Sequence, residues 1–149
     1  MAGLALAPPT PVRAAPIVNT CASTGAGSLA SIVGAAAAGD TITFAQDCTG
    51  ASAITLTGTL TPTVALTINA TGRSVTISGG NTVQLFDVNS SITLSLKALT
   101  LANGKTTFFG GAILNSGTVQ VTGSTFSGNT ANHGRGDLQR QWRYPGGDR

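Results

Sequence analysis

The chain has 149 residues, of which 41% are hydrophobic and only 9% are charged. This length suits a single domain, and so high an apolar content excludes an intrinsically disordered chain. The formal charge of +3 comes mainly from the last fifteen residues. Up to residue 134 the charged side chains are Arg13, Arg73, Lys97, Lys105, Asp40, Asp47 and Asp87. They form no basic stripe interleaved with aromatic residues, so nucleic-acid binding is not predicted.

Residues 1–20 have the composition of an export signal without its complete layout. A short apolar run, Leu-Ala-Leu-Ala, is followed by prolines and by the small-residue pair Ala14–Ala15. A signal peptide would need a basic segment and a longer apolar run. We therefore expect either the remnant of a signal peptide or a disordered leader rich in proline and alanine. No stretch of the chain reaches the length of a transmembrane helix.

The two cysteines, Cys21 and Cys48, flank the next segment, residues 21–50. In an exported protein an even pair suggests a disulfide, which would close a loop of about 28 residues and stabilise the fold by on the order of 3 kcal/mol. The alternative is two buried free thiols. No Cys-x-x-Cys pair or neighbouring histidine indicates a metal site.

A helix is predicted over residues 28–38. Leu29, Ile32 and Val33 share one helix face, Ser28 is a suitable N-cap, and Gly39 is a suitable stop. We expect residues 21–50 to cap a β structure, because the open end of stacked strands exposes unpaired edges and apolar core.

Short strands are predicted over most of residues 51–133. Apolar residues alternate with Thr or Ser in short runs that end at Gly, Asn or Pro, which is typical of strands separated by tight turns. The expected strands are 40–44, 53–57, 64–68, 74–78, 83–88, 92–96, 99–101, 112–114, 118–121 and 125–126. Strands this short, recurring about every 20 to 26 residues, favour a coil with three sheets per turn over a sandwich.

About three or four turns of such a coil fit between residues 51 and 133, each adding about 4.8 Å along the axis. Four aromatic side chains are expected in its core: Phe86, Phe108, Phe109 and Phe126. Asn89 and Asn115 both precede Ser at the end of a strand. We expect them to be successive members of an asparagine ladder along the axis.

Residues 110–129 read as one complete unit of the repeat: Gly-Gly-Ala-Ile-Leu-Asn-Ser-Gly-Thr-Val-Gln-Val-Thr-Gly-Ser-Thr-Phe-Ser-Gly-Asn. Glycine and asparagine tolerate a positive φ, which suits sharp corners between strands, and Gly111 is one expected position of this kind. The residues expected to carry the architecture are Gly110, Gly111, Ala112, Ile113, Asn115, Phe126 and Asn129.

The Gly-Gly-Ala-Ile and Phe-Ser-Gly-Asn segments resemble the paired GGAI and FxxN motifs of polymorphic outer-membrane protein repeats. Gly-Ala-Gly-Ser-Leu at residues 25–29 is similar to a segment that precedes the β-helix in related bacterial surface proteins. The resemblance implies an all-β fold, a right-handed parallel β-helix of the pectin-lyase type. It also implies an adhesin-like protein, extracellular or at a cell surface such as a bacterial outer membrane, whose ligand is an unidentified protein or glycan.

The composition changes abruptly at Arg135. Residues 135–149 hold four of the eight basic residues and the only Trp and Tyr. Codons compatible with Gly134–Asp148, read one base later, can encode Gly-Gly-Ala-Ile-Tyr-Asn-Asp-Ser-Gly-Gly-Thr-Leu-Ala-Val-Thr, which places a new Gly-Gly-Ala-Ile 24 positions after Gly110. We hypothesise that residues 134–149 are an out-of-frame tail on a truncated repeat protein. The alternative is a natural basic C-terminal arm.

Catalysis is not predicted, because the chemistry of β-helix enzymes needs residues that this sequence does not group. Hydrolases of polysaccharides need two carboxylates around the scissile bond, and lyases need acidic Ca²⁺ ligands with a base. Asp87 is the only carboxylate expected on a turn of the coil, and His133 is the only histidine. We predict no catalytic, cofactor or metal-binding residue. The alternative is a fragment of a carbohydrate-active β-helix enzyme whose catalytic turns are absent. An uncapped last turn would also permit edge-to-edge self-association.

Overall fold

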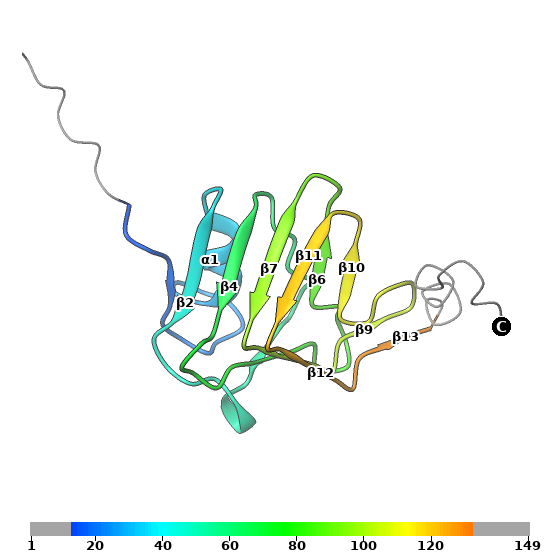
Figure 1. Ribbon diagram of the computed structural model, residues 1–149. Coiled ribbons are helices and arrows are strands. Elements are labelled where there is room, and N and C mark those ends of the chain that lie inside the picture. The colour runs from blue at the N-terminus through cyan, green and yellow to red at the C-terminus, as the bar shows by residue number, and fades with distance from the viewer. Residues whose placement is uncertain (1–12, 133–149) are drawn as a thin grey trace, which may run out of the picture.

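Thirteen short strands, one α-helix and one 3₁₀ turn make up the part of the chain that the structure, a computed structural model, describes, residues 13–132 (Figure 1). The helices are α1 (Leu29–Ala35) and the 3₁₀ turn Gly50–Ser52. The strands are β1 (Ile17–Val18), β2 (Asp40–Phe44), β3 (Ile54–Thr55), β4 (Leu66–Asn69), β5 (Thr76–Ser78), β6 (Phe86–Val88), β7 (Thr93–Lys97), β8 (Thr100–Ala102), β9 (Lys105–Thr106), β10 (Ile113–Asn115), β11 (Thr118–Thr122), β12 (Thr125–Ser127) and β13 (Thr130–Ala131).

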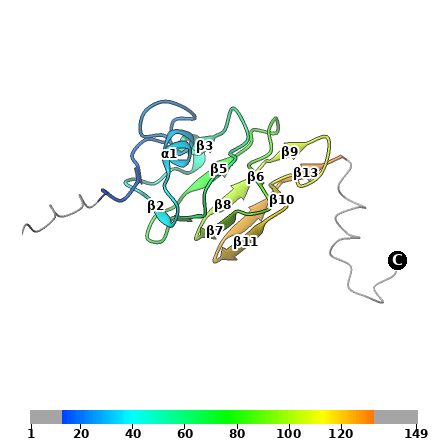
Figure 2. The same cartoon turned by 90° about the horizontal axis from the view of Figure 1, so that it is seen from above.

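Parallel pairing of these strands builds three walls around one axis (Figures 1 and 2). The first wall has the order β1-β2-β4-β7-β11, the second the order β12-β8-β5-β3, and the third pairs β10 with β6. A short fourth pair, β13 with β9, follows the second wall along the chain. Since each strand of the first wall belongs to a new turn, or coil, of the chain, the solenoid has about five coils. The predicted all-β parallel β-helix is therefore confirmed.

The core consists of side chains that stack in rows from coil to coil. Alternate residues of a strand point to opposite faces, so one set enters the interior and the other points outward. In-register pairing then places equivalent inward residues on one another. The two clearest rows are Ile42, Ile68, Leu96 and Val121 in the first wall, and Ile54, Ile77, Leu101 and Phe126 in the second.

The N-terminal end of the solenoid is covered by α1, as predicted (Figures 1 and 2). The Ser28 hydroxyl accepts a hydrogen bond from the Ser31 N–H, and Leu29 and Val33 are buried in the core. The helix ends at Ala35, three residues before the predicted end. The reason is local: the Asp40 carboxylate accepts a hydrogen bond from the Ala37 N–H at 2.8 Å, so this N–H does not bond to a carbonyl of the helix.

The first wall extends further toward the N-terminus than the three or four turns expected between residues 51 and 133. Strands β1 and β2 both precede residue 51 and join the wall ahead of β4. Ile17 and Val18, which the sequence places in the leader, pair with Thr43 and Phe44, and Val18 is buried. Residues 1–12 of the proposed leader lie outside the described residues, as does the whole of the proposed tail, residues 134–149.

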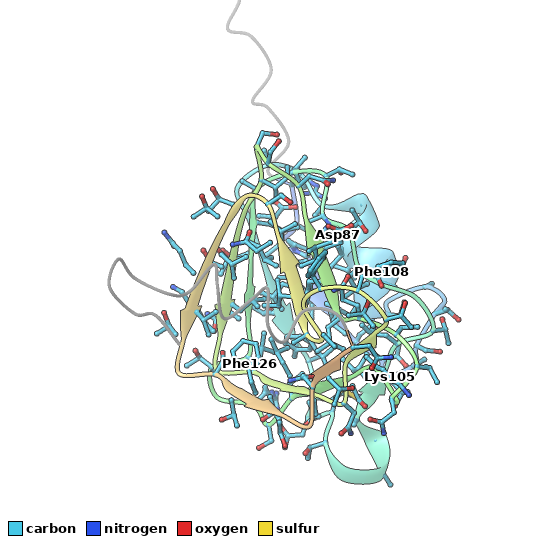
Figure 3. All side chains as sticks on the ribbon, turned by 90° about the vertical axis from the view of Figure 1, so that its right-hand side faces the viewer. Asp87, Lys105, Phe108 and Phe126 are labelled. Carbon is cyan, nitrogen blue, oxygen red and sulfur yellow. A yellow bond between two sulfur atoms is a disulfide. The ribbon has the colours of Figure 1, made fainter. Side chains whose placement is uncertain are left out.

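Only one of the four phenylalanines expected in the core is buried there. Phe86 is fully buried, but Phe108, Phe109 and Phe126 are 66%, 39% and 47% exposed. Phe126 occupies an inward position, paired with Leu101, but it belongs to the last described coil (Figure 3). Phe108 and Phe109 lie between β9 and β10, outside any strand. The expectation was wrong for these three residues, because alternation does not reveal which coil ends the stack.

One row of the first wall gives a test of this architecture. Leu96 is fully buried between Ile68 and Val121, whereas Val121 is 42% exposed in the same row. Leu96→Ala should lower the free energy of unfolding by about 2 to 5 kcal/mol. Val121→Ala should cost less than about 1 kcal/mol, because little apolar area is lost from the interior. Urea denaturation of both variants measures the difference, and equal losses would contradict the stacking order.

Candidate functional site

The residues of the Gly-Gly-Ala-Ile motif lie in the last described coil, where they join the third wall. Ile113 pairs with Phe86 of the preceding coil, and the carbonyl of Ala112 accepts hydrogen bonds from the N–H groups of Leu85 and Phe86, both at 3.0 Å. Ala112 is buried and Ile113 is half-buried. The motif therefore attaches one coil to the next through its backbone, and its contacts are architectural.

The two glycines of the motif are needed for different reasons. Gly110 has a φ of +68°, a conformation that L-residues with a side chain rarely adopt. Gly111 has no positive φ, contrary to the expectation for this residue. Instead, a Cβ atom at Gly111 would lie 2.6 Å from the N and O atoms of Thr130. The start of this coil, at Gly111, and its end, at Thr130, approach so closely that only a residue without a side chain fits at Gly111.

Asn129, at the end of the repeat unit, connects two coils through its side chain. Its Oδ1 accepts a hydrogen bond from the Gly104 N–H at 2.7 Å, and its Nδ2 donates to the carbonyl of Leu101 at 2.9 Å. Both partners belong to the preceding coil. The asparagine thus satisfies backbone groups at a corner where the strands do not pair.

Asn89 and Asn115 do not form the expected ladder. The register pairs Asn115 with Val88, so the two asparagines are offset by one position. Asn115 instead accepts a hydrogen bond from the Gly117 N–H at 3.0 Å, which closes its own turn. An offset of one residue in a strand reverses which face a side chain occupies, and the lengths of the connecting loops decide it.

Cys21 and Cys48 form a disulfide whose Cα atoms are 5.5 Å apart. Cys21 follows β1, and Cys48 pairs with Val75 in a single bridge beside the second wall. Cys48 is fully buried. The bond therefore ties the N-terminal segment to a different wall of the solenoid from the one that β1 joins.

Two of the described carboxylates, Asp40 and Asp47, are engaged in local contacts. Asp40 forms an ion pair with Arg13, whose guanidinium also donates to the carbonyl of Ala35 at 3.0 Å. The hydrogen bond from Arg13, and then that from the Ala37 N–H, lower the pKa of Asp40 below its ordinary value. This contribution to stability is present at neutral pH and is lost as the pH falls below the ordinary aspartate pKa toward the lowered one. Asp47 accepts from the Ser74 N–H at 3.0 Å.

Asp87 is on β6 in the third wall, whereas Asp40 is on β2 in the first. Within residues 13–132 no three His, Cys, Asp or Glu side chains gather as metal ligands would. Asp40 and Asp87 thus lie on different walls of the solenoid.

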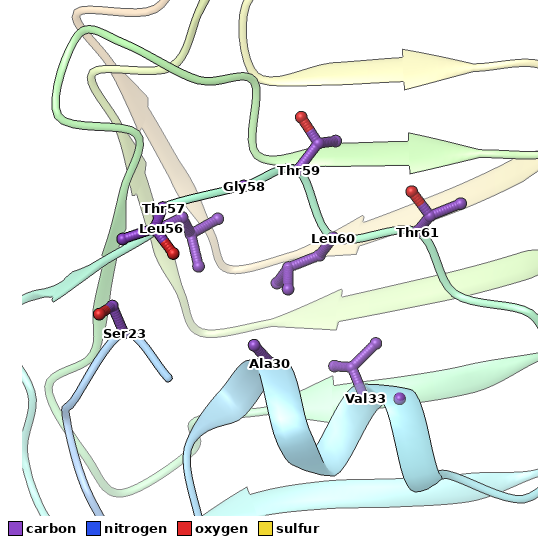
Figure 4. Close-up of a pocket in the computed structure, with 10 residues that line it drawn as sticks. Ser23, Ala30, Val33, Leu56, Thr57, Gly58, Thr59, Leu60 and Thr61 are labelled. Carbon is purple, nitrogen blue, oxygen red and sulfur yellow. The ribbon is translucent and has the colours of Figure 1, made fainter. Parts of the chain in front are cut away.

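A shallow pocket of about 260 Å³ lies between α1 and residues 56–61 (Figure 4). Ala30 and Val33 of the helix face Leu56 and Leu60 across it, and hydroxyl side chains such as Thr59 line its rim. No titratable side chain lines the pocket, and its volume is just below the range of about 300 to 1,000 Å³ common for ligand sites. The pocket therefore lies beside the capping helix and is lined by apolar and hydroxyl side chains and by glycines.

Sequence reasoning missed one residue that positions the last coil. The Nε2 atom of Gln84 donates to the carbonyl of Phe109 at 2.8 Å and to that of Gly110. Gln84 belongs to the preceding coil, so these hydrogen bonds fix the position of the loop between β9 and β10. A lone glutamine after an apolar residue carries no sequence signal for this role.

Comparison with protein-family models, with curated proteins and with solved structures finds no match for the chain. Among the described residues, no helix combines the length and the apolar character that crossing a bilayer demands.

Gly111 allows the close approach of its backbone to that of Thr130 to be tested without a change in φ. Gly111→Ala should lower the free energy of unfolding by about 1 to 3 kcal/mol, because Thr130 must move to admit the methyl group. Gly58 is the matched control, since it also lacks a positive φ but has no atom within 4 Å of an added Cβ. Gly58→Ala should change the stability by no more than about 0.5 kcal/mol. Equal stability of the two variants in thermal or urea denaturation would refute the close contact.

Proposed function

We propose that the chain is a non-enzymatic presentation scaffold of an exported protein, extracellular or at a cell surface, with an adhesin-like role. In this proposal the solenoid is a rigid rod with a hydroxyl-rich surface. The rod holds this surface away from the cell, where it can bind a protein or glycan ligand. The outward rows of the walls are the observation that carries the proposal.

Two outward rows are regular and uncharged, whereas a third, formed by Asn69, Lys97 and Thr122 of the first wall, carries one lysine. In the first wall Thr41, Thr67, Ser95 and Gln120 follow one another in register, and in the second wall Thr76, Thr100 and Thr125 do so. The Ser95 hydroxyl donates a hydrogen bond to the side-chain Oε1 of Gln120 at 3.2 Å along the first row. Such rows offer hydrogen-bond donors and acceptors at the spacing of paired strands, about 4.8 Å, with no group suited to acid–base chemistry.

Export is supported by the disulfide between Cys21 and Cys48, because disulfides persist in oxidising compartments and are rare in the cytosol. The resemblance of residues 110–129 to outer-membrane repeats agrees with the same location. The adhesin-like role depends on this resemblance together with the neutral rows.

The proposal is tested by presenting the oxidised, full-length chain to an array of surface glycans and extracellular proteins. We expect saturable binding to at least one of them, and no release of oligosaccharides from a panel of polysaccharides. Gln120→Lys should weaken this binding by about tenfold or more, because a charge would then interrupt the row of the longest wall.

Ser116→Lys is the matched control, since Ser116 is also exposed and lies on the same coil, but in the turn between β10 and β11 and outside both rows. Its binding should stay close to that of the parent chain, and circular dichroism checks the fold of both variants. Release of oligosaccharides would replace the proposal with a carbohydrate-active enzyme. Absence of binding throughout the array would remove the adhesin-like role.

A further inference from the structure

The two ends of the solenoid are closed differently. At the N-terminal end, α1 and the segment around β1 cover the core. At the other end lies the coil of residues 110–132, which we call the open end. Its strands β10, β11, β12 and β13 are each the last strand of their sheet (Figure 3). Each therefore presents an edge that no other described strand pairs.

The inward side chains of the open end are apolar but incompletely covered. Val121 and Phe126 are 42% and 47% exposed, while their partners one coil earlier, Leu96 and Leu101, are fully buried. Val119 is only half-buried, although Leu94 beneath it is fully buried. The exposed apolar positions coincide with the unpaired edges, so one further layer of strand would cover both.

We propose that the open end seats one further coil, whose sequence is obtained by reading codons 134–148 one base later. In that frame, codons compatible with Gly134–Asp148 can encode Gly-Gly-Ala-Ile-Tyr-Asn-Asp-Ser-Gly-Gly-Thr-Leu-Ala-Val-Thr, which repeats residues 110–122 with two extra residues in the turn. In this alignment its Ile corresponds to Ile113, its Leu to Val119 and its Val to Val121. Apolar residues thus recur at these three inward positions, while Thr recurs at the outward positions of Thr118 and Thr122.

The lengths also fit the solenoid. The new Gly-Gly-Ala-Ile begins 24 positions after Gly110, and the two extra residues place the following strand 26 positions after Thr118. Paired strands in the structure are separated by 23 residues (Ile54 and Ile77) to 28 residues (Leu66 and Leu94). The two extra residues fall in the turn between the third and the first wall, where loop lengths already differ between coils.

The shifted frame stays open over these fifteen codons whatever synonymous codons are used. A stop codon begins with T, and in this frame the first base of each triplet is the second base of an original codon. Leu138 is the only residue from Gly134 to Asp148 whose codon has T at that place. Its shifted triplet ends in the first base of a Gln codon, which is C, so it cannot be a stop.

The test compares the 149-residue chain with a shifted chain, in which these fifteen residues directly follow His133. Amide hydrogen exchange is measured for residues 113–122 in both, because the fifteen new residues align with strands β10 and β11. In the shifted chain we expect exchange to slow by about tenfold or more at these residues, because the edge strands gain a pairing partner. The urea m-value should rise as well, since unfolding then exposes more surface.

The matched control is the shifted chain with Ser in place of the Ile, the Leu and the final Val of the new coil. It has the same length and charge, and it should exchange as fast as the 149-residue chain. Equal protection by the control, or no added protection in the shifted chain, would overturn the proposal. Sedimentation at two concentrations tests whether a second copy of the chain binds the open end instead. If both chains form the same dimer and are equally protected, the open end seats a second copy.

Discussion

Each coil of this protein depends on the coil beside it for both its hydrogen bonds and its core. The strands pair in parallel along the axis, so the backbone groups of one coil are satisfied by its neighbours. The same register stacks inward side chains, as Ile77 does between Ile54 and Leu101. Stability is therefore a property of adjacent coils, and it decreases wherever the stack ends. The capping helix relieves this constraint at one end, and the coil of residues 110–132 shows its effect at the other.

The same constraint determines what the molecule can offer to a partner. Inward positions are committed to packing, so recognition is left to the outward rows and the loops. Those rows carry Thr, Ser and Gln at regular intervals, while Asp40 and Asp47 are occupied by local contacts. A surface of this kind can recognise a ligand by shape and by hydrogen bonds, and this is the reason that we favour presentation over catalysis.

Much of the architecture follows from the sequence, because alternation of apolar and hydroxyl residues has the strand period. The helix with its Ser28 cap and strands such as β2 and β7 lie where the pattern predicts them. The pattern fails where a strand is too short to show alternation. Strands β9 and β13 have two residues each, and the sequence predicts neither.

Other features could not be read from local patterns at all. The exposure of Phe126 depends on the position of its coil in the stack, and the offset between Asn89 and Asn115 depends on loop length. The role of Gly111 depends on Thr130, which is nineteen positions away in the sequence and in contact only after the chain has coiled. These are consequences of register between coils, and a single sequence does not display that register.

The register of the first wall is the most direct test of this account. NMR contacts between backbone protons across strands would locate the neighbours of Ser95. We predict contacts to Thr67 on one side and to Gln120 on the other, both in parallel geometry, because these three residues occupy successive coils. Antiparallel contacts between β7 and β8, which are adjacent in the sequence, would indicate a hairpin and would contradict the solenoid.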